Sequence, residues 1–216
     1  FVDTIRRYNR IIRMRNAAIR DKTPDLLPVL DGQAAAAGLE IQRRRFTTVD
    51  EFNQTFTKLF AFVSALDEQV TIRYAPSWKN CDTIDRAIEE LESHRDRDRV
   101  MQTSTCGPHR DRFSFRYRDK DFARTASTGQ LRLLSLVLRV AQAVHFTGTS
   151  TRLPTLLLDD VLLELDPEKR RRFIEVLPEY DQAYFTFLPD ERYDRYRRAK
   201  TMSYNVSAGN LEDRKG

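Results

Sequence analysis

The chain has 216 residues, of which 40% are hydrophobic and 32% are charged, and its net charge is +5. This balance supports a folded core, and because no run of roughly 18 apolar residues occurs, we expect a soluble protein without a membrane partner. Cys81 and Cys106 are too few and too far apart for a zinc site or a disulfide framework, so a reducing cytoplasm is the expected location.

Helical patterns dominate the first third of the chain. Apolar residues at near-helical spacing predict a helix over residues 1–21 and a second helix over 25–45. Asp50 can cap a third helix that runs to about Asp67. Together these helices would form an antiparallel arm. Because the helical pattern is already under way at the first residue, we expect further sequence upstream.

The arm carries the excess of positive charge. Residues 1–20 hold six arginines against the single acid Asp3. Such an asymmetry indicates an anionic partner, for which we take DNA, although a solvated helix face would show the same pattern. We expect two groups of arginines to bind DNA. Arg6, Arg10 and Arg13 lie on the first helix, and Arg43, Arg44 and Arg45 form a cluster near an arm end.

From residue 70 onward the period of the pattern changes. Short strands alternate with helices, which favours an α/β fold with a mostly parallel sheet. We divide the chain into an arm domain, 1–98, with a linking strand near 70–74, and a second domain, 99–216. The other expected elements are a helix over 82–96, a hairpin of strands 113–117 and 122–124 around a turn at 118–121, a helix over 130–144, a buried strand at 156–158, a helix over 167–177, a buried strand at 184–187 and an edge strand at 203–206.

Two carboxylates, Asp159 and Asp160, follow the apolar residues 156–158. Phosphoryl transfer needs a metal ion near the transferred phosphates and a carboxylate that orients the attacking water. In that interpretation Asp159 would hold Mg²⁺, usually through water, and Asp160 would polarise the attacking water. The plain alternative is that Asp159 caps the next turn and Asp160 points into solvent. Adjacent carboxylates at a buried strand end repel each other, which favours the catalytic interpretation.

Ser127, Gly129 and Gln130 open the apolar helix that precedes this strand. Glycine at a helix start lets the backbone approach an anion, and the free N–H groups there bind phosphate. The Ser127 hydroxyl could donate to a phosphate oxygen, or it could be an ordinary N-cap. Its placement one helix before Asp159 favours a nucleotide site.

Two further segments stand out. Asp166 precedes Pro167 and can cap the next helix, and a role at a dimer contact is not separable from that alternative. A second segment combines a rigid turn, an imidazole and a guanidinium: Gly107, Pro108, His109, Arg110 and Asp111. The sequence contains no metal-ligand spacing and no nucleophile–His–Asp arrangement.

These residues resemble the RecF family of bacterial recombination and replication-repair proteins. The similarity runs from residue 8 to the C-terminus and is most specific at 107–111, followed by 126–132, 158–161 and 164–166. The resemblance implies the C-terminal part of an ABC/SMC-type P-loop ATPase head with an inserted antiparallel helical arm. Because the family's Walker A loop, G-x-x-x-x-G-K-[ST], does not occur in this sequence, this chain alone should not hold ATP.

The resemblance also implies roles for single residues. Asp159 and Asp160 match the Walker B carboxylates, and the segment 164–166 matches the D-loop that crosses the dimer interface, with Glu164, Leu165 and Asp166. The signature motif, which faces the nucleotide of the other subunit, is matched by Ser127, Gly129, Gln130 and Arg132. Three departures from the family pattern are Leu163 in place of a serine, Arg112 in place of an acid, and Thr186 near the position of a switch histidine.

The implied function is an ATP-dependent, dimerising, DNA-binding clamp that helps load RecA with RecO and RecR. Its expected substrates are double-stranded and gapped DNA and single-stranded DNA at junctions, in repair, replication, recombination and the SOS response. ATP and Mg²⁺ belong to the full-length protein, a weak DNA-dependent ATPase, and neither is expected on this chain alone. The alternative is a non-catalytic DNA- or protein-interaction module derived from an ABC ATPase.

Overall fold

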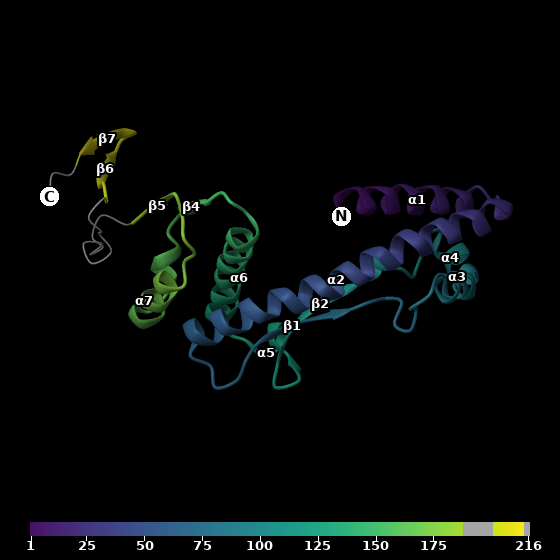
Figure 1. The fold of residues 1–216 in the computed structure, drawn as a ribbon, viewed down its shortest axis with the longest axis horizontal. Helices are drawn as coiled ribbons and strands as arrows, with labels where there is room; N and C mark the ends of the chain where they lie inside the picture. Colours follow the sequence, from purple (N-terminus) through teal and green to yellow (C-terminus); the bar gives the residue numbers. More distant parts are fainter. Residues whose placement is uncertain (188–200, 214–216) are drawn as a thin grey trace.

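A computed structural model describes residues 1–187 and 201–213 and shows an elongated molecule built along one long helix (Figure 1). Helix α1 (Val2–Arg20) turns through the short 3₁₀ segment η1 (Pro24–Leu26) and lies antiparallel to α2 (Leu27–Ser64). Helices α3 (Ile84–Ser93) and α4 (Arg95–Met101) lie at the far end of this pair, where α1 turns into α2. The first helix and the antiparallel arm are therefore as predicted.

The arm has fewer helices than the sequence suggested. The sequence predicts separate helices over 25–45 and from Asp50 to about Asp67, but α2 is continuous over 38 residues. Its stretch 39–64 contains neither proline nor glycine, and Asp50 lies exposed within the helix instead of capping a new one. The helix ends only at Ala65, which takes a left-handed conformation with φ 55°. A capping residue such as Asp50 therefore does not start a new helix when no proline or glycine ends the helix before it.

A three-stranded antiparallel sheet lies against α2. Strand β1 (Thr71–Ala75) pairs with β2 (Arg112–Tyr117), which pairs with β3 (Lys120–Asp121). Arg118 and Asp119 make the hairpin turn with φ of 47° and 58°, as a two-residue turn of this hand requires. The return strand predicted at 122–124 is wrong: Asp121 accepts a hydrogen bond from the Ala123 amide and caps helix α5 (Phe122–Thr125).

The rest of the chain combines helices with two small sheets. Helix α6 (Thr128–Thr149) leads to β4 (Thr155–Leu158), and the 3₁₀ segment η3 (Val161–Glu164) and helix α7 (Pro167–Glu175) lead to β5 (Gln182–Phe185). Strands β4 and β5 are parallel and pair Leu158 with Phe185. Strands β6 (Tyr204–Ser207) and β7 (Asn210–Asp213) form an antiparallel hairpin.

Two expectations about the strands are wrong. Among the described residues only β4 and β5 are parallel, so the sheets are mostly antiparallel. The strand at 156–158 is not buried on both faces, because Leu158 is 8% exposed while Leu157 is 77% exposed. One face of the β4–β5 pair packs on the core and the other is open.

No described helix is both long and apolar enough to cross a membrane.

The hydrophobic residues form two clusters that share α2. The first cluster packs α1 against the N-terminal half of α2 and includes Trp78 and Leu91. The second packs the C-terminal half of α2, with Phe56 and Phe60 fully buried, against α6, β4 and α7. Cys106 belongs to the first cluster, so that cluster extends past residue 98. The domain boundary there stays a prediction.

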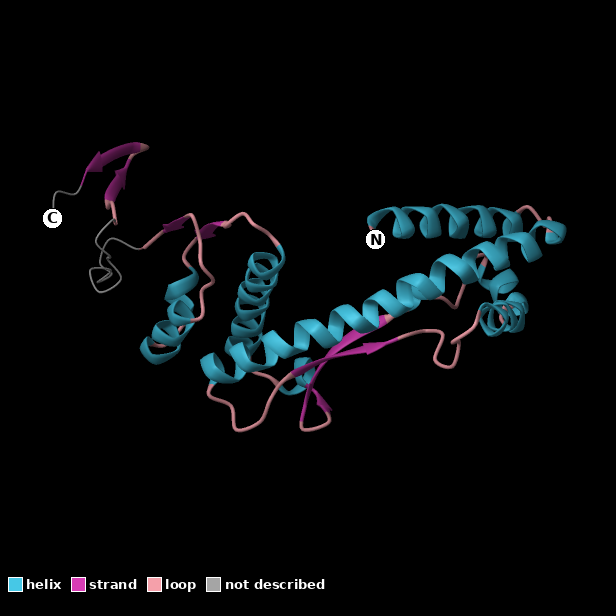
Figure 2. Cartoon of the chain, in the orientation of Figure 1, coloured by secondary structure: helices cyan, strands magenta, loops and turns pink. Residues whose placement is uncertain are grey.

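A buried ionic network fastens the far end of the arm. The Arg15 guanidinium donates to Asp31 through Nε and to Asp98 through Nη1, both at 2.6 Å, and all three side chains are fully buried. Burial opposes the charged form of Arg15, but the hydrogen bonds to the two carboxylates raise its pKa, so it stays a cation. Since Asp31 lies in α2 and Asp98 in α4, one side chain of α1 joins three helices. Figure 2 shows these helices gathered at the end of the arm where α1 turns into α2.

Replacing Arg15 by alanine should lower the free energy of unfolding by about 3–5 kcal/mol, because two buried carboxylates lose their shared cation. Urea denaturation followed by circular dichroism measures the change. Arg20→Ala, on the exposed side of the same helix, is the matched control and should cost less than about 0.5 kcal/mol. Equal losses in the two variants would contradict a stabilising role for the network.

Candidate functional site

The two carboxylates predicted to be catalytic lie at the carboxyl end of the parallel strand pair. Thr186, directly after β5, bonds with both: its hydroxyl lies 2.8 Å from Asp159 Oδ1 and 3.3 Å from Asp160 Oδ1. The Asp160 amide donates to the same hydroxyl at 2.9 Å. Asp160 takes a left-handed conformation with φ 51°, which turns the chain sharply after the strand. One hydroxyl thus ties the ends of β4 and β5 together and holds the carboxylates in place.

This pair of carboxylates has the chemistry of a magnesium site but not a complete ligand set. Asp159 and Asp160 are both exposed, and the described residues contain no group of three or more His, Cys, Asp or Glu that could hold a metal. Mg²⁺ commonly takes one or two protein carboxylates and fills its other positions with water and substrate phosphate oxygens. The residues present therefore fit a metal that binds together with a phosphate ligand.

Thr186 is the contact that the sequence did not predict. The sequence marks this position only as a departure from a switch histidine. The available signal was positional: Asp159 follows one apolar strand and Thr186 follows the other. Parallel strands end at the same edge of a sheet, and ligand-binding residues gather at that edge in α/β folds.

The helix start at Ser127 is a complete capping box. Ser127 Oγ accepts from the Gln130 amide at 3.2 Å, and Gln130 Oε1 accepts from the Ser127 amide at 2.8 Å. Ser127 and Gly129 are exposed, and a Cβ added at Gly129 would meet nothing closer than Ser127 Oγ at 4.0 Å. The N-cap alternative is thus satisfied, and the end of the helix is still open to an anion. Arg132 is exposed on the same first turns.

The structure does not bring this helix start and the carboxylates into one site. Helix α6 has 22 residues, so its length is about 33 Å at about 1.5 Å per residue. In Figure 1 it begins beside α5 and ends where the chain turns toward β4. A ligand at Ser127 and a ligand at Asp159 would therefore be separate within one chain.

The segment predicted to cross a dimer interface, residues 164–166, directly precedes α7. Leu165 is buried, and Asp166 caps the helix by accepting from the Lys169 amide at 2.9 Å. Hydrogen bonds from Lys169, the ammonium group at 2.6 Å among them, lower the pKa of Asp166. The side chains of Leu163 and Glu164 lie outside the part that the structure describes.

The predicted DNA-binding arginines fall into two groups. Five of them, Arg6, Arg10, Arg13, Arg43 and Arg44, are exposed. Three make weak local contacts: Arg6 with Asp3 at 3.3 Å, Arg13 with the Asn9 carbonyl at 3.3 Å, and Arg44 with Glu40 at 3.1 Å. Arg45 differs, because its Nη1 donates to Asp111 at 2.5 Å and to the Pro108 carbonyl at 2.6 Å. The structure thus gives Arg45 a contact inside the protein.

Residues 107–111 form the junction between the arm and the sheet. Asp111 accepts hydrogen bonds from the Tyr74 hydroxyl, from Arg45 and from the Ser77 amide, at 2.5, 2.5 and 2.8 Å. These partners belong to β1, to α2 and to the loop after β1. Burial, together with the hydrogen bond to Asp111, raises the pKa of Tyr74, which keeps its proton. One carboxylate with a side-chain exposure of 1% therefore fastens three segments.

Gly107 and His109 fasten the same junction to α1. Gly107 has φ 116°, and a Cβ there would lie 2.5 Å from the Tyr8 hydroxyl oxygen, so only glycine fits. His109 Nε2 lies 3.0 Å from the Ser104 carbonyl, which can only accept, so Nε2 carries the proton. His109 Nδ1, 3.0 Å from the Tyr8 hydroxyl, must then accept from it. The sequence indicated the motif but not these partners.

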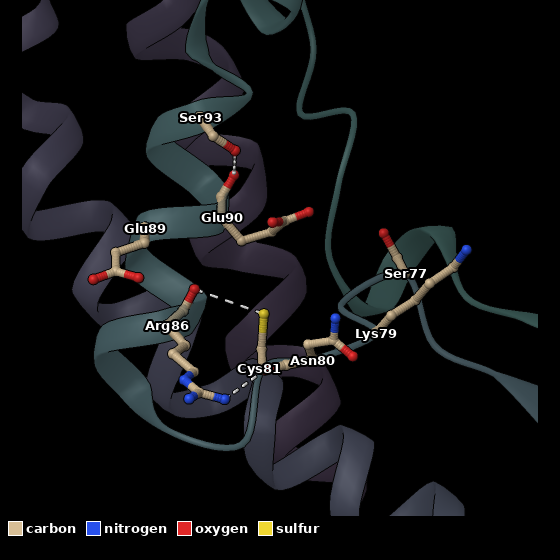
Figure 3. A pocket seen from close by; sticks show the side chains of 8 residues that line it. All are labelled: Ser77, Lys79, Asn80, Cys81, Arg86, Glu89, Glu90 and Ser93. Carbon is tan, nitrogen blue, oxygen red and sulfur yellow. Dashed lines mark hydrogen bonds between the residues drawn. The ribbon is translucent and has the colours of Figure 1, made fainter.

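A surface hollow of about 640 Å³ lies beside this junction, between α3 and the loop after β1 (Figure 3). Its walls carry charges of both signs, and its polar groups bond to neighbouring backbone: Ser93 to Glu90 at 2.9 Å and Cys81 to Arg86 at 3.6 Å. Burial raises the pKa of the Cys81 thiol, which makes it a poor nucleophile. The hollow offers no catalytic arrangement.

Two solved structures share this fold. They are described as the recombination mediator protein RecF in the RecFOR pathway, one as RecF-ATP and one as RecF-ATPrS, with TM-scores of 0.75 and 0.73. Each is 20% identical in sequence to this chain, and the match covers 98% of this chain and 58% of that chain. The fold is that of the C-terminal part of an α/β, ABC-type ATPase head with a helical arm.

Curated relatives identify the family within that class. The DNA replication and repair protein RecF of Treponema pallidum (strain Nichols) is 44% identical over 209 residues, which are 97% of this chain and 59% of that protein. The protein of the same name from Streptococcus suis (strain 05ZYH33) is 30% identical over 192 residues, 86% of this chain and 52% of that protein. No protein-family model matches the chain. The chain belongs to the RecF family and spans between half and three-fifths of these relatives.

His109 should make the stability of the protein depend on pH. Burial lowers the pKa of its imidazole below the value of about 6.5 expected in the unfolded chain. The stabilising contribution is therefore complete above about pH 6.5 and is lost as the pH falls through the lower folded-state pKa, because the unfolded chain then binds more protons. Urea unfolding at a series of pH values should show a smaller loss on acidification for His109→Gln than for the wild type. Parallel curves would contradict this.

Proposed function

We propose that this chain forms the arm and the C-terminal part of the ATPase head of a RecF-family protein that acts in recombinational DNA repair and replication restart. The full-length protein would be an ATP-dependent homodimer that clamps DNA at single- and double-strand junctions in the cytoplasm. It would work with RecO and RecR in loading RecA. The observation that carries this proposal is the arrangement of Asp159, Asp160 and Thr186 at the carboxyl end of β4 and β5.

The roles of the carboxylates follow from their positions. Asp159 would hold Mg²⁺ in the full-length protein, and Asp160 would orient the attacking water toward the γ-phosphate. Bound magnesium would supply positive charge against the phosphate oxygens. The Thr186 hydroxyl has one hydrogen and lies within bonding distance of both carboxylates, so it fixes their orientation without neutralising either. A hydroxyl at this position could not carry charge to a phosphate as an imidazolium would.

The helix start at Ser127 is suited to the second half of a composite site. Ser127 Oγ accepts from the Gln130 amide, and this leaves its own hydroxyl hydrogen to donate to a phosphate oxygen. The positive end of the α6 dipole favours an anion there. Because α6 separates this point from Asp159, the nucleotide that it contacts would belong to the partner subunit of the dimer.

If the chain is instead part of a non-catalytic interaction module, replacing Asp160 should leave ATP turnover unchanged. In the full-length protein, Asp160→Asn should lower the rate of ATP turnover by about 10²–10⁴-fold, the range expected when a general base is removed. Asp119→Asn is a matched control, since Asp119 is also exposed and also has a positive φ, of 58°. An unchanged turnover in Asp160→Asn would favour the non-catalytic module.

The arm should bind the DNA backbone. Changing Arg6, Arg10 and Arg13 together to glutamine in the full-length protein should weaken duplex binding and reduce the slope of log Kd against log salt by about 2–3, since each lost phosphate contact contributes about 0.9. Fluorescence anisotropy at several salt concentrations measures this. The control changes three exposed arginines elsewhere, Arg97, Arg139 and Arg152, by the same charge. Equal slopes in both variants would exclude Arg6, Arg10 and Arg13 as contacts to the DNA backbone.

A further inference from the structure

The β1–β2 ribbon has two chemically different faces. On one face Tyr74 pairs with Phe113 and Ile72 with Phe115. This face packs on α2, where the ring centroid of Tyr74 lies 4.8 Å from that of Phe46, and Phe115 lies 6.1 Å from Phe56. The aromatic contacts fix the ribbon against the helix and so fix the direction of its other face.

The opposite face carries three arginines. Side chains alternate along a strand, so Arg73 on β1 and Arg112, Ser114 and Arg116 on β2 share this face. Arg73 pairs with Ser114, which places Arg112 and Arg116 on the two diagonals from Arg73, at about 7–8 Å. Arg73 and Arg112 are exposed, and Arg116 is partly exposed. The ribbon thus presents three arginines on one face, here called the ribbon triad.

Among the described residues, no carboxylate lies within 4.0 Å of the guanidinium nitrogens of the ribbon triad. The nearest acids in sequence have other partners. Asp111 is turned into the junction, and Asp121, across from Arg116 in the register, accepts from the Ala123 amide. Asp67 pairs with Arg118 in the adjoining turn. Asp121, as the cross-strand partner of Arg116, shares this face, so three arginines stand against one carboxylate and the face keeps an excess of positive charge.

We propose that the ribbon triad, Arg73, Arg112 and Arg116, is a second binding surface for the sugar–phosphate backbone of nucleic acid, separate from the arginines of α1. This inference rests on the proposed DNA-binding function and assigns part of it to a sheet. In Figure 1 the ribbon lies along a different side of α2 from α1, so one continuous strand of nucleic acid would have to pass around the long helix to meet both surfaces.

The chemistry favours a polyanion over an isolated anion. Three like charges at this spacing repel one another in the folded protein, and a row of phosphates neutralises them together. Guanidinium groups bind phosphate through two parallel hydrogen bonds. Such contacts read the backbone and not the base sequence.

The test compares three triple variants of the full-length protein. Arg73, Arg112 and Arg116 are changed to glutamine in the first, Arg6, Arg10 and Arg13 in the second, and the control arginines Arg97, Arg139 and Arg152 in the third. Binding to a fluorescein-labelled random-sequence duplex is measured by anisotropy between about 50 and 200 mM salt. Circular dichroism and thermal melting establish that each variant is folded.

The ribbon triad variant should bind more weakly than the control, with a slope of log Kd against log salt smaller by about 2–3 than that of the wild type, and equally for duplexes of different sequence. A slope equal to the control's, while the α1 variant loses affinity, would overturn the ribbon triad alone. Absence of salt-sensitive DNA binding in the wild type would overturn the proposed function together with this inference. Retained DNA binding with loss of an acidic protein partner would assign the face to protein and overturn the proposal.

If the triple variant is unfolded, charge reversal at one position replaces it. Arg112→Glu lies at the end of the ribbon next to the Asp111 junction, whereas Arg73→Glu lies at its centre, so the two differ in the structure around them. Both should weaken DNA binding more than Arg97→Glu does. DNA binding equal to that of Arg97→Glu in both folded variants would overturn the proposal.

Discussion

The carboxylate of Asp111 is the contact on which the arrangement of arm and sheet depends. It accepts from Arg45 on α2, from Tyr74 on β1 and from the amide of Ser77, and its side chain is almost fully buried. A carboxylate in such a site is stable only while its donors stay in place, so the three segments are fixed together. The strand that begins at the next residue then runs beneath α2 toward the helix start at Ser127.

At two other polar sites, as at Asp111, a single side chain joins several segments. Arg15 joins three helices through two carboxylates, and Thr186 joins the ends of two strands through one hydroxyl. The difference lies in exposure. Arg15 is sealed in the core and can only support the fold, whereas Asp159 and Asp160 are tied down yet open to solvent. Held in position and accessible, the aspartates have the properties that a phosphate-handling site requires.

Positive charge is distributed over surfaces that a single helix separates. Arg6, Arg10 and Arg13 of α1 are exposed on the arm, and Arg73, Arg112 and Arg116 occupy the free face of the ribbon. Arg45 shows that a cluster in sequence is not a cluster in space, since its neighbours Arg43 and Arg44 are exposed while it binds Asp111. Charge that is used inside the protein and charge that is offered to a partner look the same in the sequence.

The sequence by itself determined the local structure wherever a short periodic pattern or a single capping residue is enough to specify a helix or a strand. It was sufficient for α1, for β1, for the helix cap at Asp166 and for the position of Asp159 and Asp160 after a strand, and it offered the Ser127 cap as one of two alternatives. It did not predict the continuity of α2, the open face at Leu157 or the helix at 122–125. The first and the last of these have local causes, the lack of a helix breaker in α2 and the Asp121 cap of α5, which the pattern analysis did not weigh. Only the tertiary structure decided the open face at Leu157 and the partners of Asp111, His109 and Thr186. The reason is physical: capping and periodicity act over a few residues, whereas burial and the hydrogen bonds of Asp111 and Thr186, and that of His109 to Tyr8, join residues that lie tens of positions apart in the chain.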